Sequence, residues 1–64
     1  MPFIQVSIGK ASTEQKKKMI ETFTKEAAEI MGFRESDFYV LISENPAENW
    51  GIGGKTLADI KAGK

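Results

Sequence analysis

Hydrophobic and polar residues alternate along the first segment of the chain, residues 2–8. Ile4, Val6 and Ile8 fall on one side of this segment, and a period of two predicts a strand whose apolar side packs against a core. The opposite side, which begins with Phe3, mixes apolar and polar residues, as is typical of an interface or of a pocket wall. We therefore expect residues 2–8 to form a strand with one core-facing side.

The pattern then changes to apolar residues at spacings of three and four, which predicts an amphipathic helix. Ser12 is the expected N-cap, with Gln15 completing a capping box, and the helix is expected to reach Met31. Gly32 is expected to end it in the left-handed conformation. The predicted apolar stripe consists of Met19, Ile20, Phe23, Ala27, Ile30 and Met31.

A second strand is predicted for residues 38–43, which are almost continuously apolar or β-branched. Such a run is typical of a strand that is buried on both faces. A strand, a helix and a second strand in this order predict a β-α-β unit with parallel strands and a right-handed crossover. The expected fold class is therefore α/β (α+β), built from a single β-α-β unit.

The remaining residues predict a loop, a glycine-rich turn and a short helical turn. Residues 45–49 are expected to form the loop, and three glycines in residues 50–54 permit tight turning of the backbone. Next to these glycines, Trp50 and Ile52 are predicted to project toward a neighbouring subunit or a ligand. Thr56 is a candidate cap for a brief helical turn near the C-terminus.

Size and composition narrow the function classes. A chain of 64 residues allows one domain, residues 1–64, and buries only about 60% of its unfolded surface. Without Cys or His it has no disulfide, and a metal site is not expected. Two strands and one helix leave one sheet face and both edges uncovered, so self-association is the expected means of stabilisation.

Charge and hydropathy argue against several partners. Nine basic and nine acidic residues give a net charge of zero, which disfavours a nucleic-acid binder. No apolar run is long enough to span a membrane, so a membrane partner is not expected. The sequence also shows no secretory signal, and the cytoplasm is the expected location.

The candidate for chemistry is Pro2, because the chain has neither His nor Cys and only one Arg. Removal of Met1 would leave Pro2 with a free secondary amine at the start of a strand. A general base must be substantially unprotonated near neutral pH, and apolar surroundings favour the neutral amine. Alternatively, Pro2 only begins an edge strand, where its missing N–H costs nothing.

Four features together resemble the 4-oxalocrotonate tautomerase family over nearly the whole chain. They are the Met-Pro start, a β-α-β unit of this length, the helix start at residues 14–16 and the motif of residues 50–54. The resemblance implies a C-terminal hairpin, a homohexamer that is a trimer of dimers, and removal of Met1. It also implies that Pro2 is the general base of a keto–enol tautomerase that needs no metal or cofactor. The implied substrates are small 2-hydroxydienoate or 2-oxo acid enols such as 2-hydroxymuconate.

The resemblance assigns a pocket wall to the late aromatic residue, here Trp50. The apolar material available around the Pro2 amine is Phe3, Phe38, Trp50 and Ile52, and Ile52 is a further candidate for substrate binding. Two arginines that hold carboxylates in the family enzyme for muconate-type diacids are missing. Lys10 or Ala11 stands near the first, and Tyr39 aligns with the second. Lys10 binds a carboxylate only as a point charge, whereas Tyr39 offers one hydrogen bond to an enolate oxygen.

These departures leave other interpretations open. Lys10 can be a solvated loop residue, Tyr39 a structural residue, and Trp50 simple interface packing. A monocarboxylate enol of the phenylpyruvate type is a plausible substrate in place of a diacid. Alternative functions are a proline-dependent hydratase, dehalogenase or decarboxylase on the same scaffold, or a self-assembling module without catalysis.

Overall fold

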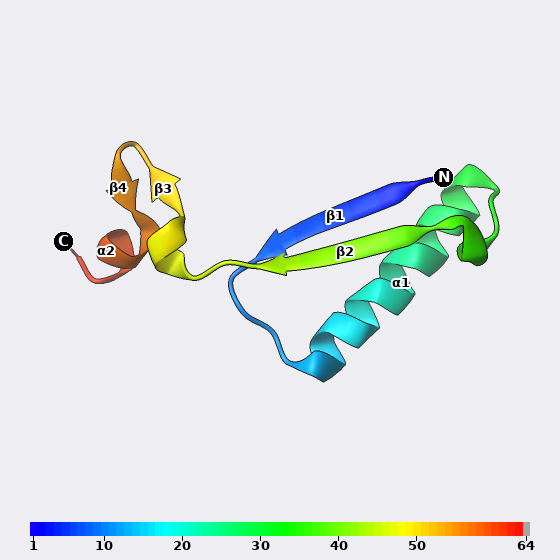
Figure 1. The fold of residues 1–64 in the computed structure, drawn as a ribbon, viewed down its shortest axis with the longest axis horizontal. Helices are drawn as coiled ribbons and strands as arrows, with labels where there is room; N and C mark the ends of the chain where they lie inside the picture. Colours follow the sequence, from blue (N-terminus) through cyan, green and yellow to red (C-terminus); the bar gives the residue numbers. More distant parts are fainter. Residues whose placement is uncertain (64) are drawn as a thin grey trace.

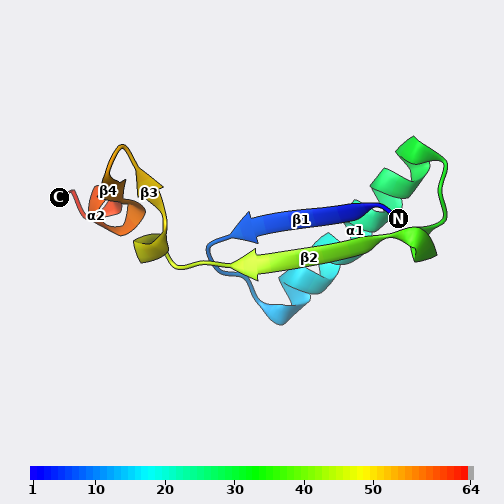
Figure 2. The ribbon, with the colours of Figure 1, turned by 45° about the horizontal axis from the view of Figure 1, so that its top comes forward.

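Two parallel strands and one long helix form the body of the protein. The computed structural model describes residues 1–63. Strand β1 (Phe3–Ile8) leads through a short loop into helix α1 (Thr13–Met31), and strand β2 (Tyr39–Glu44) follows. The strands pair in parallel from Phe3 beside Tyr39 to Ile8 beside Glu44, while α1 covers one face of the pair (Figures 1 and 2). The predicted β-α-β unit is confirmed, with each strand one residue later at its start.

Both ends of α1 are capped as predicted. The Ser12 hydroxyl accepts the Gln15 backbone N–H at 3.1 Å, and the Gln15 side chain accepts the Ser12 N–H at 2.9 Å. At the other end, Gly32 has φ 70° and donates its N–H to the carbonyl of Ala28 at 2.9 Å. The N–H of Phe33 bonds to the same carbonyl at 3.1 Å. The left-handed glycine thus turns the chain back so that Phe33 follows the last turn of the helix.

The small core lies between α1 and the sheet, and its composition corrects the predicted apolar stripe. Ala28, outside that stripe, is 6% exposed, and Phe38 is 9% exposed. By contrast, Ile30 is 84% exposed, and Ile20 and Met31 are exposed as well. The helix crosses the strands obliquely (Figure 1), so a straight stripe along α1 does not follow the side that faces the sheet.

The two faces of the sheet differ in burial. Ile4, Val6 and Ile8 are half-buried on the side of α1, as the alternating pattern predicted. On the other side Phe3 and Tyr39 are each 57% exposed. The expectation that residues 38–43 are buried on both faces is therefore wrong for the single chain, because only one helix is available and it covers one face.

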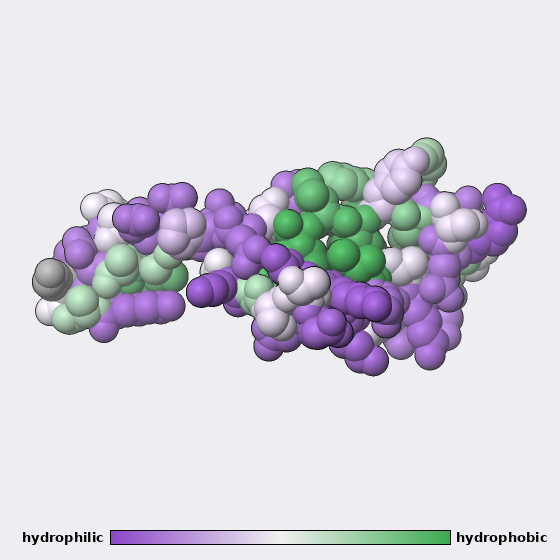
Figure 3. All heavy atoms as spheres, turned by 60° about the horizontal axis from the view of Figure 1, so that its bottom comes forward, coloured by the Kyte–Doolittle hydropathy of each residue, from purple (hydrophilic) through white to green (hydrophobic). Residues whose placement is uncertain are grey.

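Apolar side chains remain on the surface of the single chain. Figure 3 shows one such face, where hydrophobic side chains gather in the middle of the body with hydrophilic ones along the lower border. Contiguous apolar surface of this kind is typical of sites where a protein meets a partner. The large exposed hydrophobic residues are Met1, Phe3, Ile20, Phe23, Ile30, Met31, Phe33, Tyr39, Leu41, Trp50, Ile52 and Ile60.

Residues 45–63 form an arm that extends beyond the C-terminal ends of β1 and β2, at the opposite end of the molecule from the N-terminus (Figures 1 and 2). The arm comprises a 3-10 turn (Ala47–Asn49), a hairpin of β3 (Gly51–Ile52) and β4 (Lys55–Thr56), and helix α2 (Leu57–Lys61). The predicted C-terminal hairpin is confirmed. So is the cap at Thr56, whose hydroxyl accepts the N–H of Asp59 at 3.1 Å.

The arm makes the molecule long and thin, with extents of 47 × 25 × 14 Å. Within residues 1–63, no helix has the length and apolar character needed to cross a membrane.

Candidate functional site

Pro2 lies at the free end of the body, beside the turn that precedes β2. It is half-buried, and its carbonyl accepts the N–H of Tyr39 at 3.1 Å. A hollow of about 170 Å³ is lined here by Met1, Pro2, Phe33 and Asp37. The left-handed end of α1 and the turn before β2 supply Phe33 and Asp37, so local chain reversals shape the surroundings of Pro2.

The charge of Asp37 next to this hollow is partly balanced by Arg34. The Arg34 guanidinium lies 3.3 Å from one Asp37 carboxylate oxygen, and the Arg34 backbone N–H donates to the other at 3.3 Å. Consequently, the single arginine of the chain is engaged at the Pro2 end. Phe33 also lies near Phe38, with ring centroids 6.5 Å apart, so apolar groups border the same region.

A second and larger cavity, of about 480 Å³, lies between the arm and the C-terminal ends of the strands; we call it the arm cavity. Trp50 forms part of its wall, and the indole N–H donates to the carbonyl of Asn45 at 3.1 Å, which fixes the ring. The cavity is lined by Ser7, Ile8, Gly9, Lys10, Asn45, Pro46, Ala47, Trp50, Leu57 and Lys61.

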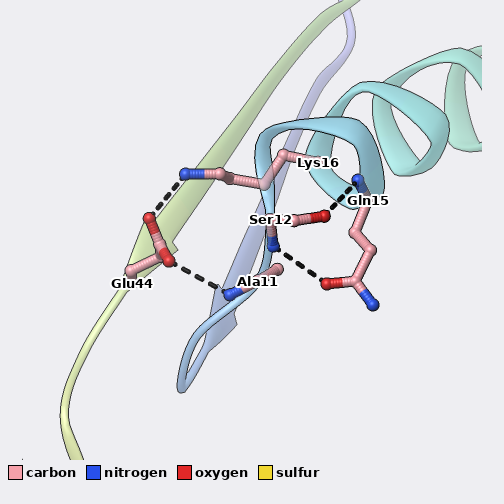
Figure 4. Close-up of polar contacts among 5 residues, drawn as sticks. All are labelled: Ala11, Ser12, Gln15, Lys16 and Glu44. Carbon is pink, nitrogen blue, oxygen red and sulfur yellow. Dashed lines mark hydrogen bonds and ion pairs between the residues drawn. The ribbon is translucent and has the colours of Figure 1, made fainter.

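The loop that carries Lys10 is tied to the end of β2 by Glu44 (Figure 4). Lys16 lies 2.6 Å from one Glu44 oxygen, and the Ala11 N–H donates to the other at 3.1 Å. The hydrogen bond from Lys16, followed by that from Ala11, holds the pKa of Glu44 below its ordinary value; the charge of Lys10 contributes least. These contacts position the Lys10 backbone at the rim of the arm cavity.

The predicted site residues fall into two groups within one chain. Pro2 and Tyr39 lie together at the start of the strands, whereas Lys10 and Trp50 line the arm cavity beyond their ends. A strand of six residues spans about 20 Å, so the groups cannot meet within one chain. Ile52 lies on the exposed hairpin and lines neither the hollow nor the arm cavity.

Of the residues that line the arm cavity, sequence reasoning named only Lys10 and Trp50 as site residues, and it missed Lys61 and Leu57 among others. Both come from α2, which was expected only as a brief turn. Their place in the cavity depends on a hydrogen bond that the residue pattern does not show. The Leu57 N–H donates to the carbonyl of Trp50 at 2.9 Å, which folds α2 back over the cavity. Among residues 1–63, no cluster of three or more His, Cys, Asp or Glu side chains is arranged to hold a metal ion.

Comparisons with known proteins agree on one family. A family model described as "Tautomerase enzyme" matches residues 2–60. The chain is 38% identical over 61 residues to a 2-hydroxymuconate tautomerase of Comamonas testosteroni, covering 94% of this chain and 97% of that protein. It is also 34% identical over 61 residues to the probable tautomerase K2 of Dickeya dadantii, covering 92% and 91%.

Solved structures show the same architecture. The crystal structure of TomN, a 4-oxalocrotonate tautomerase homologue in the tomaymycin biosynthetic pathway, superimposes with a TM-score of 0.89 at 29% identity, covering 95% of each chain. DmpI from Archaeoglobus fulgidus gives 0.83 at 43% identity, covering 91% of this chain and 100% of that one. The relatives support a tautomerase activity, and the fold matches the 4-oxalocrotonate tautomerase fold. The chain belongs to the tautomerase family.

Proposed function

We propose that the protein, as a single domain of residues 1–64, is a keto–enol tautomerase that uses the amine of Pro2 as its general base after removal of Met1. The observation that carries this proposal is the position of Pro2 at the free start of β1, half-buried and lining a hollow, in a chain whose family match begins at residue 2. The proposed substrates are 2-hydroxydienoate or 2-oxo acid enols such as 2-hydroxymuconate, the substrate in the name of a relative. No cofactor is required.

The chemistry requires only one group that moves a proton. The neutral amine of Pro2 takes the proton from the enol hydroxyl and returns it to a carbon of the diene, which yields the conjugated keto acid. With Met1 attached, the Pro2 nitrogen is an amide and has no lone pair available for this step. Phe33 is the apolar neighbour of Pro2 in this hollow, and Arg34 pairs with the Asp37 carboxylate that also lines it.

Substrate contacts from the arm cavity must come from a second copy of the chain. Pro2 and the arm cavity lie at opposite ends of the strands, so a complete site forms where the Pro2 end of one copy meets the arm cavity of another. The exposed sheet face with Phe3 and Tyr39 is apolar surface for such an association. We propose a homo-oligomer, with the hexameric trimer of dimers as the expected form.

Within this composite site, the proposed roles follow the chemistry of each side chain. Lys10 attracts a carboxylate, and Trp50 provides the flat apolar wall of the arm cavity. Tyr39, on the strand next to Pro2, offers a hydroxyl to the oxygen on which charge develops. Ile52 on the exposed hairpin provides apolar cover from a neighbouring copy.

The test compares three chains: one that begins at Pro2, one that retains Met1, and one with Pro2→Ala. Ketonisation of 2-hydroxymuconate and of phenylenolpyruvate is followed by ultraviolet absorbance. We expect turnover from the chain that begins at Pro2 and a loss of at least about 10²-fold in the chain that retains Met1, because the base is blocked. Pro2→Ala presents a primary amine in place of the secondary amine and should turn over more slowly than the parent chain. Light scattering serves as the control, since all three chains should assemble equally.

Equal turnover with and without Met1 would refute the role of Pro2. Loss of assembly in the Pro2→Ala chain would indicate a structural role instead. If the assembled chain that begins at Pro2 converts neither enol, the tautomerase proposal fails for these substrates, and a self-assembling module or another proline-dependent reaction takes its place.

A further inference from the structure

The arm cavity has a charge distribution that the proposed function does not yet explain. Two of its lining residues, Lys10 and Lys61, carry a positive charge, and none carries a negative one. They lie far apart in the sequence, and both line the cavity between the arm and the C-terminal ends of the strands. A cavity with cations and no acid attracts anions.

We propose that Lys61 is a specificity-determining residue that binds the second carboxylate of a dicarboxylate substrate while Lys10 binds the first. The proposal rests on the proposed function for the identity of the substrate, but the binding itself is independent of turnover. Because Tyr39 stands where a second arginine is expected, recognition of a diacid lacks one cation. Lys61 supplies it from another element, α2.

The contacts of the arm hold the start of α2, the helix that carries Lys61, against the aromatic wall. Hydrogen bonds from the Leu57 N–H to Trp50, at 2.9 Å, and from the Trp50 indole to Asn45, at 3.1 Å, join α2, the aromatic wall and the end of β2. A planar conjugated acid therefore has a fixed flat surface on one side and a cation at the edge. The ammonium group of Lys61 then binds the second carboxylate of the substrate as a point charge.

Both lysines are available for an anion. Among residues 1–63 the ion pairs are those of Lys16 with Glu44 and of Arg34 with Asp37, and neither lysine of the arm cavity takes part. The Glu44 carboxylate interacts electrostatically with Lys10, but its two oxygens are already bound by Lys16 and by the Ala11 N–H. An incoming carboxylate thus meets weak competition for Lys10.

Trp50 provides a direct probe, because it lines the cavity and is the only tryptophan of the chain. We would titrate the assembled chain that begins at Pro2 with cis,cis-muconate, an unreactive dicarboxylate, and with its monomethyl ester, at fixed ionic strength. Trp50 fluorescence reports binding. The variants are Lys61→Ala, Lys61→Arg and Lys55→Ala, where Lys55 lies on the same arm but outside the cavity lining.

Loss of a charge-assisted contact predicts about tenfold weaker binding of the diacid by Lys61→Ala. Binding of the monoester should change by less than about twofold, Lys61→Arg should restore the diacid, and Lys55→Ala should bind like the parent chain. In turnover, Lys61→Ala should raise KM for 2-hydroxymuconate and leave kcat nearly unchanged.

If Lys61→Ala and Lys55→Ala weaken binding of the diacid equally, Lys61 acts only through the net charge of the chain, and the proposal is overturned. Unchanged affinity for the diacid in Lys61→Ala would overturn it as well. If the parent chain binds muconate through Lys61 but converts no enol, the inference about Lys61 stands and the proposed tautomerase activity fails. If the parent chain and Lys61→Ala convert 2-hydroxymuconate with the same KM, the tautomerase activity stands and the inference about Lys61 fails.

Discussion

Substitution of Gly32 by alanine isolates the energetic cost of the turn that ends α1 and places Phe33 beside Pro2. Gly32 has φ 70°, and an added Cβ would meet no atom within 4 Å. The penalty is therefore conformational and not steric. The left-handed region costs a residue with a Cβ roughly 1–2 kcal/mol. Alanine also restricts the unfolded chain, which returns about 0.4–1 kcal/mol of stability.

Gly9 is the matched control, because its φ lies outside the left-handed region and a Cβ there also meets nothing within 4 Å. Gly9→Ala should have only the effect on the unfolded chain and should be neutral or slightly stabilising. The unfolded-state contributions cancel between the two variants, so Gly32→Ala should be less stable than Gly9→Ala by about 1–2 kcal/mol.

The assay is urea denaturation followed by circular dichroism at one chain concentration, because association makes the apparent stability depend on concentration. In a parallel thermal melt, the two variants should differ by roughly 4–8 °C in Tm for each kcal/mol in a chain of this size. If Gly32→Ala is as stable as Gly9→Ala, the left-handed end of α1 does not form in solution, and the placement of Phe33 next to Pro2 is wrong.

Two further predictions concern stability. Phe38→Ala should lose about 3–5 kcal/mol of unfolding free energy in urea denaturation, because it empties a buried position. Phe33→Ala, at a half-exposed position, should lose less than half as much. Equal losses would contradict the assigned core. Glu44→Gln removes a carboxylate whose pKa is lowered mainly by the Lys16 hydrogen bond, so the parent chain should exceed this variant in stability at neutral pH. That advantage should disappear as the pH falls through the lowered pKa, because both states are then protonated. Denaturation between neutral and acidic pH measures it, and a pH-independent difference would show that the charge of Glu44 is not involved.

The secondary structure was predictable because its determinants are local. Each determinant lies within a few residues of the sequence. Examples are the alternation of Ile4, Val6 and Ile8 and the capping pair of Ser12 and Gln15, and the structure contains both. Burial along α1 was less predictable, because the crossing of the helix over the sheet depends on packing. A residue such as Ile30 therefore fits a periodic stripe and still lies in solvent.

The candidate site was only partly accessible to sequence reasoning. Lys10 and Trp50 line one cavity, which their positions in the sequence did not indicate, and their distance from Pro2 depends on the length and direction of β1. Lys61 could not be found from the sequence, because the residue pattern does not show that α2 lines the same cavity as the loop that carries Lys10.

The placement of Pro2 and the arm cavity at opposite ends of the strands has a genetic consequence under the proposed function. Each chain contributes its proline to one site and its arm cavity to another, so one defective copy harms two sites in different ways. Two alleles, one without a working Pro2 and one with a damaged arm cavity, are each inactive alone. Co-assembled in one cell, they contain between them every part of an intact site, so the two alleles can complement each other.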